Sequence, residues 1–225
     1  MDEMILESQL EELRRYYANH AQEYENIYYR DNVKRNEELK EISGAVERVC
    51  RGRRVLEVAC GTGYWTEVAA RDARSIVATD VSTEMLELAG RKDLPANKVE
   101  FRQVDAFALE GTDGDFDAGL ACFWFSHVPK SRTNDFLTHF HDRLGKGAIV
   151  FMVDNMYARG YGGELIRRPN TPDTFKRRRL SDGSTYEILK NYYDPEELER
   201  IFSHQALDLE IHDATFYWWL SYVVK

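Results

Sequence analysis

The stretch of sequence that decides the fold is Val55-Leu56-Glu57-Val58-Ala59-Cys60-Gly61-Thr62-Gly63. Its apolar first half is typical of a buried strand, and its glycines predict a sharp turn whose backbone lies close to a ligand. A helix expected over Tyr64–Asp72 then begins beside that ligand and offers it free N–H groups. A strand that ends in a glycine turn and opens a helix is the first unit of a nucleoside-binding α/β fold.

Strands and helices alternate along the chain after this unit. Four further strands are expected over Ser75–Thr79, Val99–Val104, Phe116–Phe123 and Gly147–Val153, and two further helices over Ser82–Arg91 and Ser131–Leu144. Such alternation predicts a doubly wound parallel sheet with helices on both faces. No regular pattern is visible over Asn155–Arg179, which includes the basic run Lys176–Arg179. Asp194-Pro195 then starts a short helix, and two final strands are expected over Leu207–Ile211 and Phe216–Val224.

The chain before the glycine turn is predicted to be helical. Apolar residues at helical spacing favour one helix over Glu3–Tyr29, which carries five tyrosines, and a second over Val33–Val49, capped by Asp31 or Asn32. We therefore expect a single α/β domain with three parts. Residues 1–50 form a helical cap or lid, residues 51–154 the cofactor-binding core, and residues 155–225 an acceptor-side insertion with the final strands.

Composition excludes several classes of function. The formal net charge of −9 argues against a protein that holds nucleic acid along its phosphates. The three cysteines form no C-x-x-C pair, so neither a metal site nor a disulfide framework is indicated, and a reducing cytoplasm fits. Neither a secretion signal nor a run long enough to span a bilayer is found, so no membrane partner is expected. A homodimer is compatible with the sequence.

Three carboxylates are expected around the glycine turn. Asp80 ends the second strand, where a carboxylate accepts hydrogen bonds from ribose hydroxyls, and Asp105 follows the third strand, where it suits an adenine amino group. Glu57 would repel the pyrophosphate of a dinucleotide, and Thr66 occupies the position of the third glycine in the NAD-binding motif. The trio therefore favours a cationic adenosine compound. An NAD-dependent dehydrogenase is the alternative, although no hydride-transfer site is evident.

Taken together, these motifs resemble those of class I S-adenosylmethionine-dependent methyltransferases. The matching segments are Glu57–Gly63 for the glycine motif, Asp80-Val81-Ser82 for the ribose, Asp105-Ala106 for the adenine, Phe116–Leu120 for the fourth strand and Leu144–Gly147 for the turn before the fifth. Lys146 and a missing proline depart from the family in that last turn. The resemblance is clear over Tyr16–Val153 and loose beyond it.

The resemblance implies a seven-stranded Rossmann-like sheet whose last strand is antiparallel, with S-adenosylmethionine as cofactor and S-adenosylhomocysteine as product. Tyrosine-rich N-terminal helices are typical of members that methylate small molecules, so we expect transfer to an O or N atom of a small-molecule acceptor. The cofactor-binding residues expected are Tyr17, Tyr24, Glu57, Ala59, Cys60, Gly61, Gly63, Asp80, Val81, Met85, Asp105, Ala106, Phe107, Cys122 and Phe123.

Acceptor-site candidates follow the fourth strand. His127 is a candidate general base, or else a loop histidine bonded to backbone, and Trp124 and Tyr28 are candidate acceptor contacts. His20 is expected to face solvent. The run Lys176–Arg179 is either a solvated face or a site for an acceptor's carboxylate or phosphate, and a hairpin turn is expected just after it, around Asp182-Gly183. A methyltransferase acting on protein or RNA, and a non-catalytic nucleoside-binding module, remain as alternatives.

Overall fold

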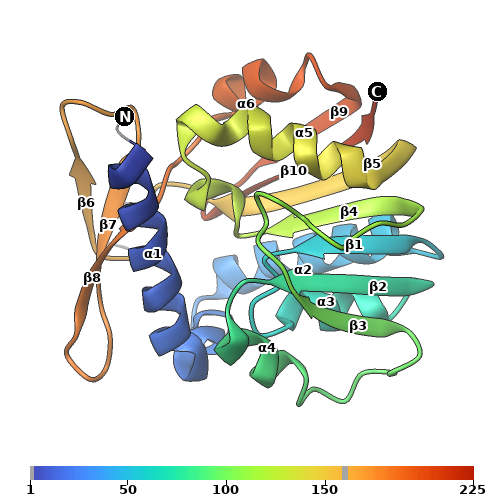
Figure 1. Cartoon of the computed structure of the whole chain (residues 1–225), viewed down its shortest axis with the longest axis horizontal. Helices are drawn as coiled ribbons and strands as arrows, with labels where there is room; N and C mark the ends of the chain where they lie inside the picture. Colours follow the sequence, from blue (N-terminus) through green and yellow to red (C-terminus); the bar gives the residue numbers. More distant parts are fainter. Residues whose placement is uncertain (1–2, 159–161) are drawn as a thin grey trace.

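The computed structural model describes residues 3–158 and 162–225. Its main element is a sheet made of β1 (Arg54–Val58), β2 (Ser75–Asp80), β3 (Val99–Gln103), β4 (Phe116–Cys122), β5 (Leu144–Asn155), β9 (Ala206–Asp213) and β10 (Tyr217–Val224). The strands lie in the order β3-β2-β1-β4-β5-β10-β9, and β10 runs antiparallel to both of its neighbours (Figure 1). The predicted seven-stranded sheet with an antiparallel last strand is therefore confirmed. Within the described ranges no helix is long and apolar enough to cross a membrane.

Helices cover both faces of this sheet. On one face lie α5 (Thr133–Arg143) and α6 (Pro195–Phe202), and on the other lie α2 (Val33–Cys50), α3 (Tyr64–Ala70) and α4 (Thr83–Ala89). Strand β5 shows why both faces are apolar. Val150 and Met152 join the core under α5 and α6, whereas Phe151 and Val153 join the core under α2 and α3, because successive side chains of a strand point to opposite faces.

Local sequence signals account for several element ends. The Asn32 side chain accepts a hydrogen bond from the Arg35 N–H at 3.0 Å and caps α2, as predicted. Asp194 and Glu197 form a capping box at the start of α6, with Pro195 in the first turn. Gly63 caps the start of α3 with φ +79°, and a Cβ there would lie 3.2 Å from the Ala89 Cβ. Both the backbone conformation and the close contact therefore favour glycine at this position.

The N-terminal segment differs from the single long helix expected over Glu3–Tyr29. An α-helix, α1 (Glu3–His20), passes into a 3-10 helix, η1 (Ala21–Ile27). In a 3-10 helix every third side chain falls in line, and here Ala21, Tyr24 and Ile27 are the inward-facing residues. These three side chains therefore lie on one side of η1.

The expectation of irregular structure over Asn155–Arg179 is wrong for two stretches of that segment. A second, antiparallel sheet is formed by β6 (Glu164–Arg167), β7 (Thr174–Arg179) and β8 (Thr185–Leu189), while residues 159–161 lie outside the described part. The predicted hairpin turn joins β7 to β8, with Gly183 at φ +88°. Figure 1 shows α1 between this small sheet and the main sheet, and Leu13 and Tyr16 of α1 pack on its Leu180 and Ile188.

Candidate functional site

The edge where the parallel strands end is the candidate site. Strand order reverses between β1 and β4, and ligands of doubly wound sheets bind outside the strand ends at such a point. Ala59 follows β1 with φ 51° and Phe123 follows β4 with φ 59°, so both adopt the left-handed conformation that non-glycine residues rarely take. Strained backbone of this kind clusters at functional sites, and here it lies at two adjacent strand ends.

Asp80 ties the glycine turn to the end of β2. One carboxylate oxygen accepts a hydrogen bond from the Gly61 N–H at 2.8 Å, and the other accepts from the Ser82 N–H at 2.9 Å. Burial raises the pKa of Asp80 above its ordinary value, and the backbone N–H groups oppose that effect by stabilising the charged form. The carboxylate therefore sits at the centre of the site, held by two backbone donors.

A small cavity, here called the acidic cavity, opens beside Asp80 with a volume of about 70 Å³. Its walls include seven residues expected at the site: Ala59, Asp80, Val81, Asp105, Ala106, Phe107 and Trp124. Trp124 was expected at the acceptor instead, but its ring packs 5.6 Å from that of Phe107. The lid supplies Leu10, Leu13 and Arg14, which were not predicted. Arg14 donates to the Asp105 carboxylate at 2.8 Å, so the lid is tied to this cavity by an ion pair.

Glu57 lies beneath the surface of the site, and its expected role in cofactor binding stays a prediction. Its side chain is buried and accepts a hydrogen bond from the Thr66 hydroxyl at 2.6 Å, and it lines none of the cavities described. Burial raises the pKa of Glu57 to about 8. The bond explains why a threonine occupies the position of the third glycine, because its hydroxyl is needed by the buried carboxyl group.

Several other expected residues contribute packing. Tyr28, a candidate acceptor contact, stacks on Tyr64 with ring centroids 3.8 Å apart and accepts a hydrogen bond from the Trp65 indole at 3.1 Å. Gly61 lies under the lid, since a Cβ there would be 3.7 Å from the Tyr24 ring. Four more expected residues are buried near the ends of the parallel strands but line neither cavity: Cys60, Gly63, Met85 and Cys122.

His127 is joined to the lid by Tyr17. Its Nδ1 lies 2.7 Å from the Leu189 carbonyl oxygen, which only accepts, so Nδ1 carries the proton and Nε2 accepts from the Tyr17 hydroxyl at 2.7 Å. Burial, aided by the nearby Lys190 charge, lowers the pKa of His127 to about 3. His127 is therefore neutral at pH 7 and lies one hydrogen bond behind Tyr17. Its catalytic role stays a prediction.

A buried ion pair that the sequence did not predict lies next to His127. The Lys190 ammonium donates to the Asp154 carboxylate at 2.8 Å and to the Ser126 hydroxyl at 2.6 Å. Burial alone would raise the pKa of Asp154, but the Lys190 charge outweighs it and the pKa is lowered. The pair joins the end of β5, the loop after β4 and the end of β8, so it fixes the small sheet to the main one.

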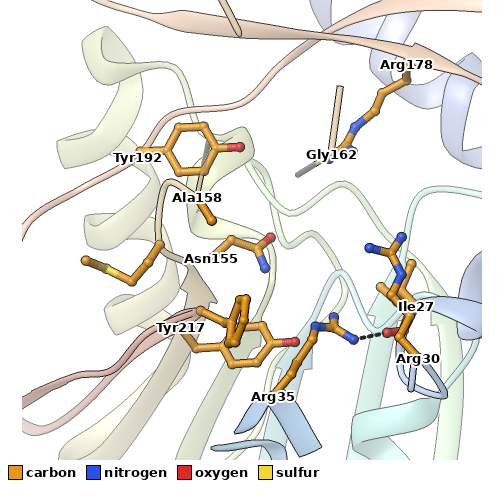
Figure 2. A pocket seen from close by; sticks show the side chains of 11 residues that line it. Ile27, Arg30, Arg35, Asn155, Ala158, Gly162, Arg178, Tyr192 and Tyr217 are labelled. Carbon is orange, nitrogen blue, oxygen red and sulfur yellow. Dashed lines mark hydrogen bonds between the residues drawn. The ribbon is translucent and has the colours of Figure 1, made fainter. Parts of the chain in front are cut away.

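A second cavity, of about 260 Å³, lies at the ends of β4 and β5. Tyr17, Tyr24 and Phe123, which were expected to bind the cofactor, line it. So does His20, which was expected to face solvent. An adjoining cavity of about 110 Å³ shares four wall residues with it: Ile27, Arg30, Asn155 and Arg178 (Figure 2). We call the two together the basic cavity, because Arg30, Arg178 and other basic side chains line them.

The acidic and basic cavities are neighbours along one edge of the sheet. The first lies at the ends of β1, β2 and β3, and the second at the ends of β4 and β5. Tyr24 lies over the glycine turn, and its ring centroid is 5.9 Å from that of Tyr17. Side chains of α1 and η1 thus line both cavities.

Known proteins resemble the chain across this site. A family model described as a methyltransferase domain matches residues 55–147. An uncharacterized methyltransferase of Staphylococcus carnosus is 25% identical over 205 residues, which is 89% of this chain and 90% of that protein. An uncharacterized protein of Mycobacterium tuberculosis is 32% identical over 142 residues, and the chain covers 48% of its length. Among solved structures, the DhpI-SAM-HEP complex superimposes with a TM-score of 0.77 at 27% identity, covering 95% of this chain and 97% of that one.

Proposed function

Because the chain is a class I S-adenosylmethionine-dependent methyltransferase, we propose that it transfers the cofactor's methyl group to an O or N atom of a small-molecule acceptor. The observation that supports the proposal is the basic cavity, which lies under the lid beside the acidic cavity. Its larger part has a volume of about 260 Å³, just below the range of roughly 300–1,000 Å³ for small-molecule sites. A protein or RNA acceptor would need an open groove instead.

The residues of the acidic cavity fit the cofactor. We assign the Asp80 carboxylate to the ribose hydroxyls and the Asp105 carboxylate to the adenine amino group. Two carboxylates in one small cavity suit a ligand with positive charge, and would repel a pyrophosphate. Arg14 holds the Asp105 oxygen that the amino group would use, so we expect cofactor binding to loosen this contact of the lid.

S-adenosylmethionine supplies an electrophilic methyl group: the acceptor's lone pair forms the new bond to carbon while the carbon–sulfur bond breaks and its electron pair stays on sulfur. The chain's own contribution is to orient the acceptor and exclude water. Tyr17 and Tyr24 lie where the two cavities meet, so their rings are suited to contact a cationic group, an interaction worth about 1 kcal/mol each.

A general base is needed only if the acceptor atom carries a proton at neutral pH. In that case the proton would pass to Tyr17 as the Tyr17 hydroxyl proton moves to His127 Nε2. With its pKa lowered to about 3, His127 is a weak base for that purpose. An acceptor atom that is already deprotonated needs no general base, and His127 then serves to position Tyr17.

Labelled cofactor tests the proposal. We would incubate the full chain with S-adenosylmethionine carrying a labelled methyl group and a cell extract divided into small-molecule, protein and RNA fractions. We expect label in the small-molecule fraction, and loss of that label with Asp80→Ala. Label that enters only protein or RNA would contradict the proposal.

Partners and location follow the same proposal. We propose that neither nucleic acid nor a membrane is a partner, in keeping with the net charge of −9. The three cysteines are free and buried, which supports a cytoplasmic location.

A further inference from the structure

The basic cavity carries an excess of positive charge that the rest of the chain does not share. The chain has 39 acidic and 30 basic residues. In the smaller part of the cavity, however, the charged wall residues are Arg30, Arg35 and Arg178, and none of its described wall residues is acidic. In the larger part Glu23 is the one carboxylate among the described walls, and it accepts a hydrogen bond from the Ser181 hydroxyl.

Arg178 is the residue common to both parts of the basic cavity. It lies on β7, and strand alternation puts it on the opposite face from Arg177, which is exposed and pairs with Glu164 at 2.7 Å. The Arg178 Nε is buried and makes no hydrogen bond to the described residues. Gly162 leaves room for this guanidinium group, because a Cβ there would lie 2.7 Å from it.

The three guanidinium groups also lack carboxylate partners in the part of the chain that the structure describes. Among the described residues none forms an ion pair with Arg30, Arg35 or Arg178. Arg35 donates to the Ile27 carbonyl and lies 5.4 Å from the centre of the Tyr217 ring. Figure 2 shows the three arginines around one side of the cavity, with Asn155 and Tyr192 across from them.

Clustered cations without carboxylate partners are unfavourable in a folded chain. Each repels the others, and for Arg35 and Arg178, which are not exposed, the partial loss of solvent adds to the cost. The Arg178 charge acts on its neighbours, since it contributes to the lowered pKa values of His20, Lys176 and Lys190, in which burial is the larger cause. The Lys190 charge is already neutralised by Asp154, so the positive charge without a carboxylate partner is that of the arginines. A bound anion would remove this cost, and guanidinium groups match the paired oxygens of a phosphate or carboxylate.

We propose that the acceptor is a small anion whose phosphate or carboxylate group is bound by Arg178, Arg30 and Arg35. Naming this anion as the methyl acceptor rests on the proposed function, whereas the anion site itself rests on the arginines alone. Arg178 lies on the wall shared by the two parts of the cavity, and Tyr17, Tyr24 and Phe123 line the end near the glycine turn. An acceptor held by its anionic group at Arg178 therefore reaches toward the cofactor.

Calorimetry on the full chain saturated with S-adenosylhomocysteine tests the site. The probes are inorganic phosphate and, separately, malonate, which tell a phosphate site from a carboxylate site. We expect one or both to bind, and Arg178→Gln to weaken that binding at least about tenfold, as the loss of a charge-assisted pair predicts. The matched control Arg177→Gln removes the same charge from the same strand on the other face, and should change the affinity by less than about twofold.

Three results would overturn the inference: no binding of either probe, equal binding by Arg178→Gln, or equal losses in the two variants. Binding of S-adenosylhomocysteine verifies that each variant is folded, and Arg178→Lys, which keeps a positive charge, should keep part of the anion affinity. The labelled-methyl experiment separates this inference from the proposed function. Label confined to protein or RNA, with phosphate still bound through Arg178, refutes only the small-molecule acceptor. Label in neutral small molecules, with no anion binding, refutes only the anion site.

Discussion

Replacing Asp80 with alanine should separate cofactor affinity from fold stability. The carboxylate accepts hydrogen bonds from two backbone N–H groups, of Gly61 at 2.8 Å and of Ser82 at 2.9 Å. We assign its remaining acceptor positions to the two ribose hydroxyls of the cofactor. Asp80→Ala removes both sets of bonds at once, but the two losses are measured in different experiments.

The size of each loss follows from the bonds. The backbone N–H groups lose their acceptor with or without cofactor, so this part lowers the free energy of unfolding, by about 1–3 kcal/mol. The ribose bonds exist only in the complex, and their loss should weaken binding by roughly 2–4 kcal/mol, or about 30- to 700-fold in Kd. Asp80→Asn should lose less affinity, because its amide oxygen still accepts one hydrogen bond.

Titration calorimetry with S-adenosylhomocysteine measures the affinity, and urea unfolding measures the stability. Asp117→Ala is the matched control. Asp117 accepts a hydrogen bond from the Arg54 N–H at 2.5 Å, at the opposite edge of the same sheet. That variant should lose stability and keep its cofactor affinity. If folded Asp80→Ala binds S-adenosylhomocysteine as tightly as the unchanged chain, Asp80 does not hold the ribose and the reasoning fails.

Three further changes probe the lid and the residues behind it. The folded-state pKa of His127, about 3, lies below the ordinary 6.5, so the folded state binds fewer protons and stability falls as pH drops below about 6.5. The stability advantage over His127→Gln should therefore shrink by up to about 1.4 kcal/mol per pH unit in urea unfolding between pH 6.5 and 5, and a constant difference would refute the assignment. Tyr17→Phe leaves the buried His127 Nε2 without its donor and should cost about 1–3 kcal/mol of stability; an unchanged unfolding midpoint would show that the bond is not formed. Arg14→Gln breaks the ion pair with Asp105 and should raise the hydrogen exchange of α1 in the absence of S-adenosylhomocysteine more than in its presence, whereas equal exchange in both states would point to a static helix.

Local signals were enough to predict the main sheet and the acidic cavity. The glycine turn and the carboxylates at strand ends are encoded by short segments, and parallel strands bring their carboxyl ends to one edge. Asp80 and Asp105 therefore met in one cavity as expected. Glu57 was assigned to the same cavity for its charge, but it precedes the strand end and points into the core, where Thr66 bonds it.

The small sheet was not predicted because consecutive charged residues on β7 lack the apolar–polar alternation typical of a strand. The run Lys176–Arg179 has no alternation of apolar and polar residues. Its burial nevertheless alternates, since Lys176 is 1% exposed whereas Arg177 is exposed. Its partner strands, β6 and β8, are its neighbours along the chain, and both pair with it in antiparallel fashion. The hairpin turn at Asp182-Gly183 was the one local signal of this sheet.

The basic cavity depends on contacts between distant segments. Arg30 lies between η1 and α2 and Arg35 lies in the first turn of α2, whereas Arg178 comes from the small sheet, so no sequence spacing links them. The Tyr17–His127 bond likewise joins residues 110 positions apart. Asp154 did leave a signal, because it is a carboxylate near the end of β5, as Asp80 is at the end of β2. A carboxylate at that position predicts a cationic partner, which is Lys190.

A crystal structure of the full chain with S-adenosylhomocysteine tests the central claim most directly, because it locates the sulfur atom relative to the two cavities. We expect the ribose hydroxyls within hydrogen-bond distance of Asp80, about 2.7–3.2 Å, and the sulfur at the boundary of the basic cavity, between Tyr24 and Phe123. The methyl group of the cofactor would then face the arginines across the acceptor. A ribose bound away from Asp80, or a sulfur that faces away from the basic cavity, would contradict the account.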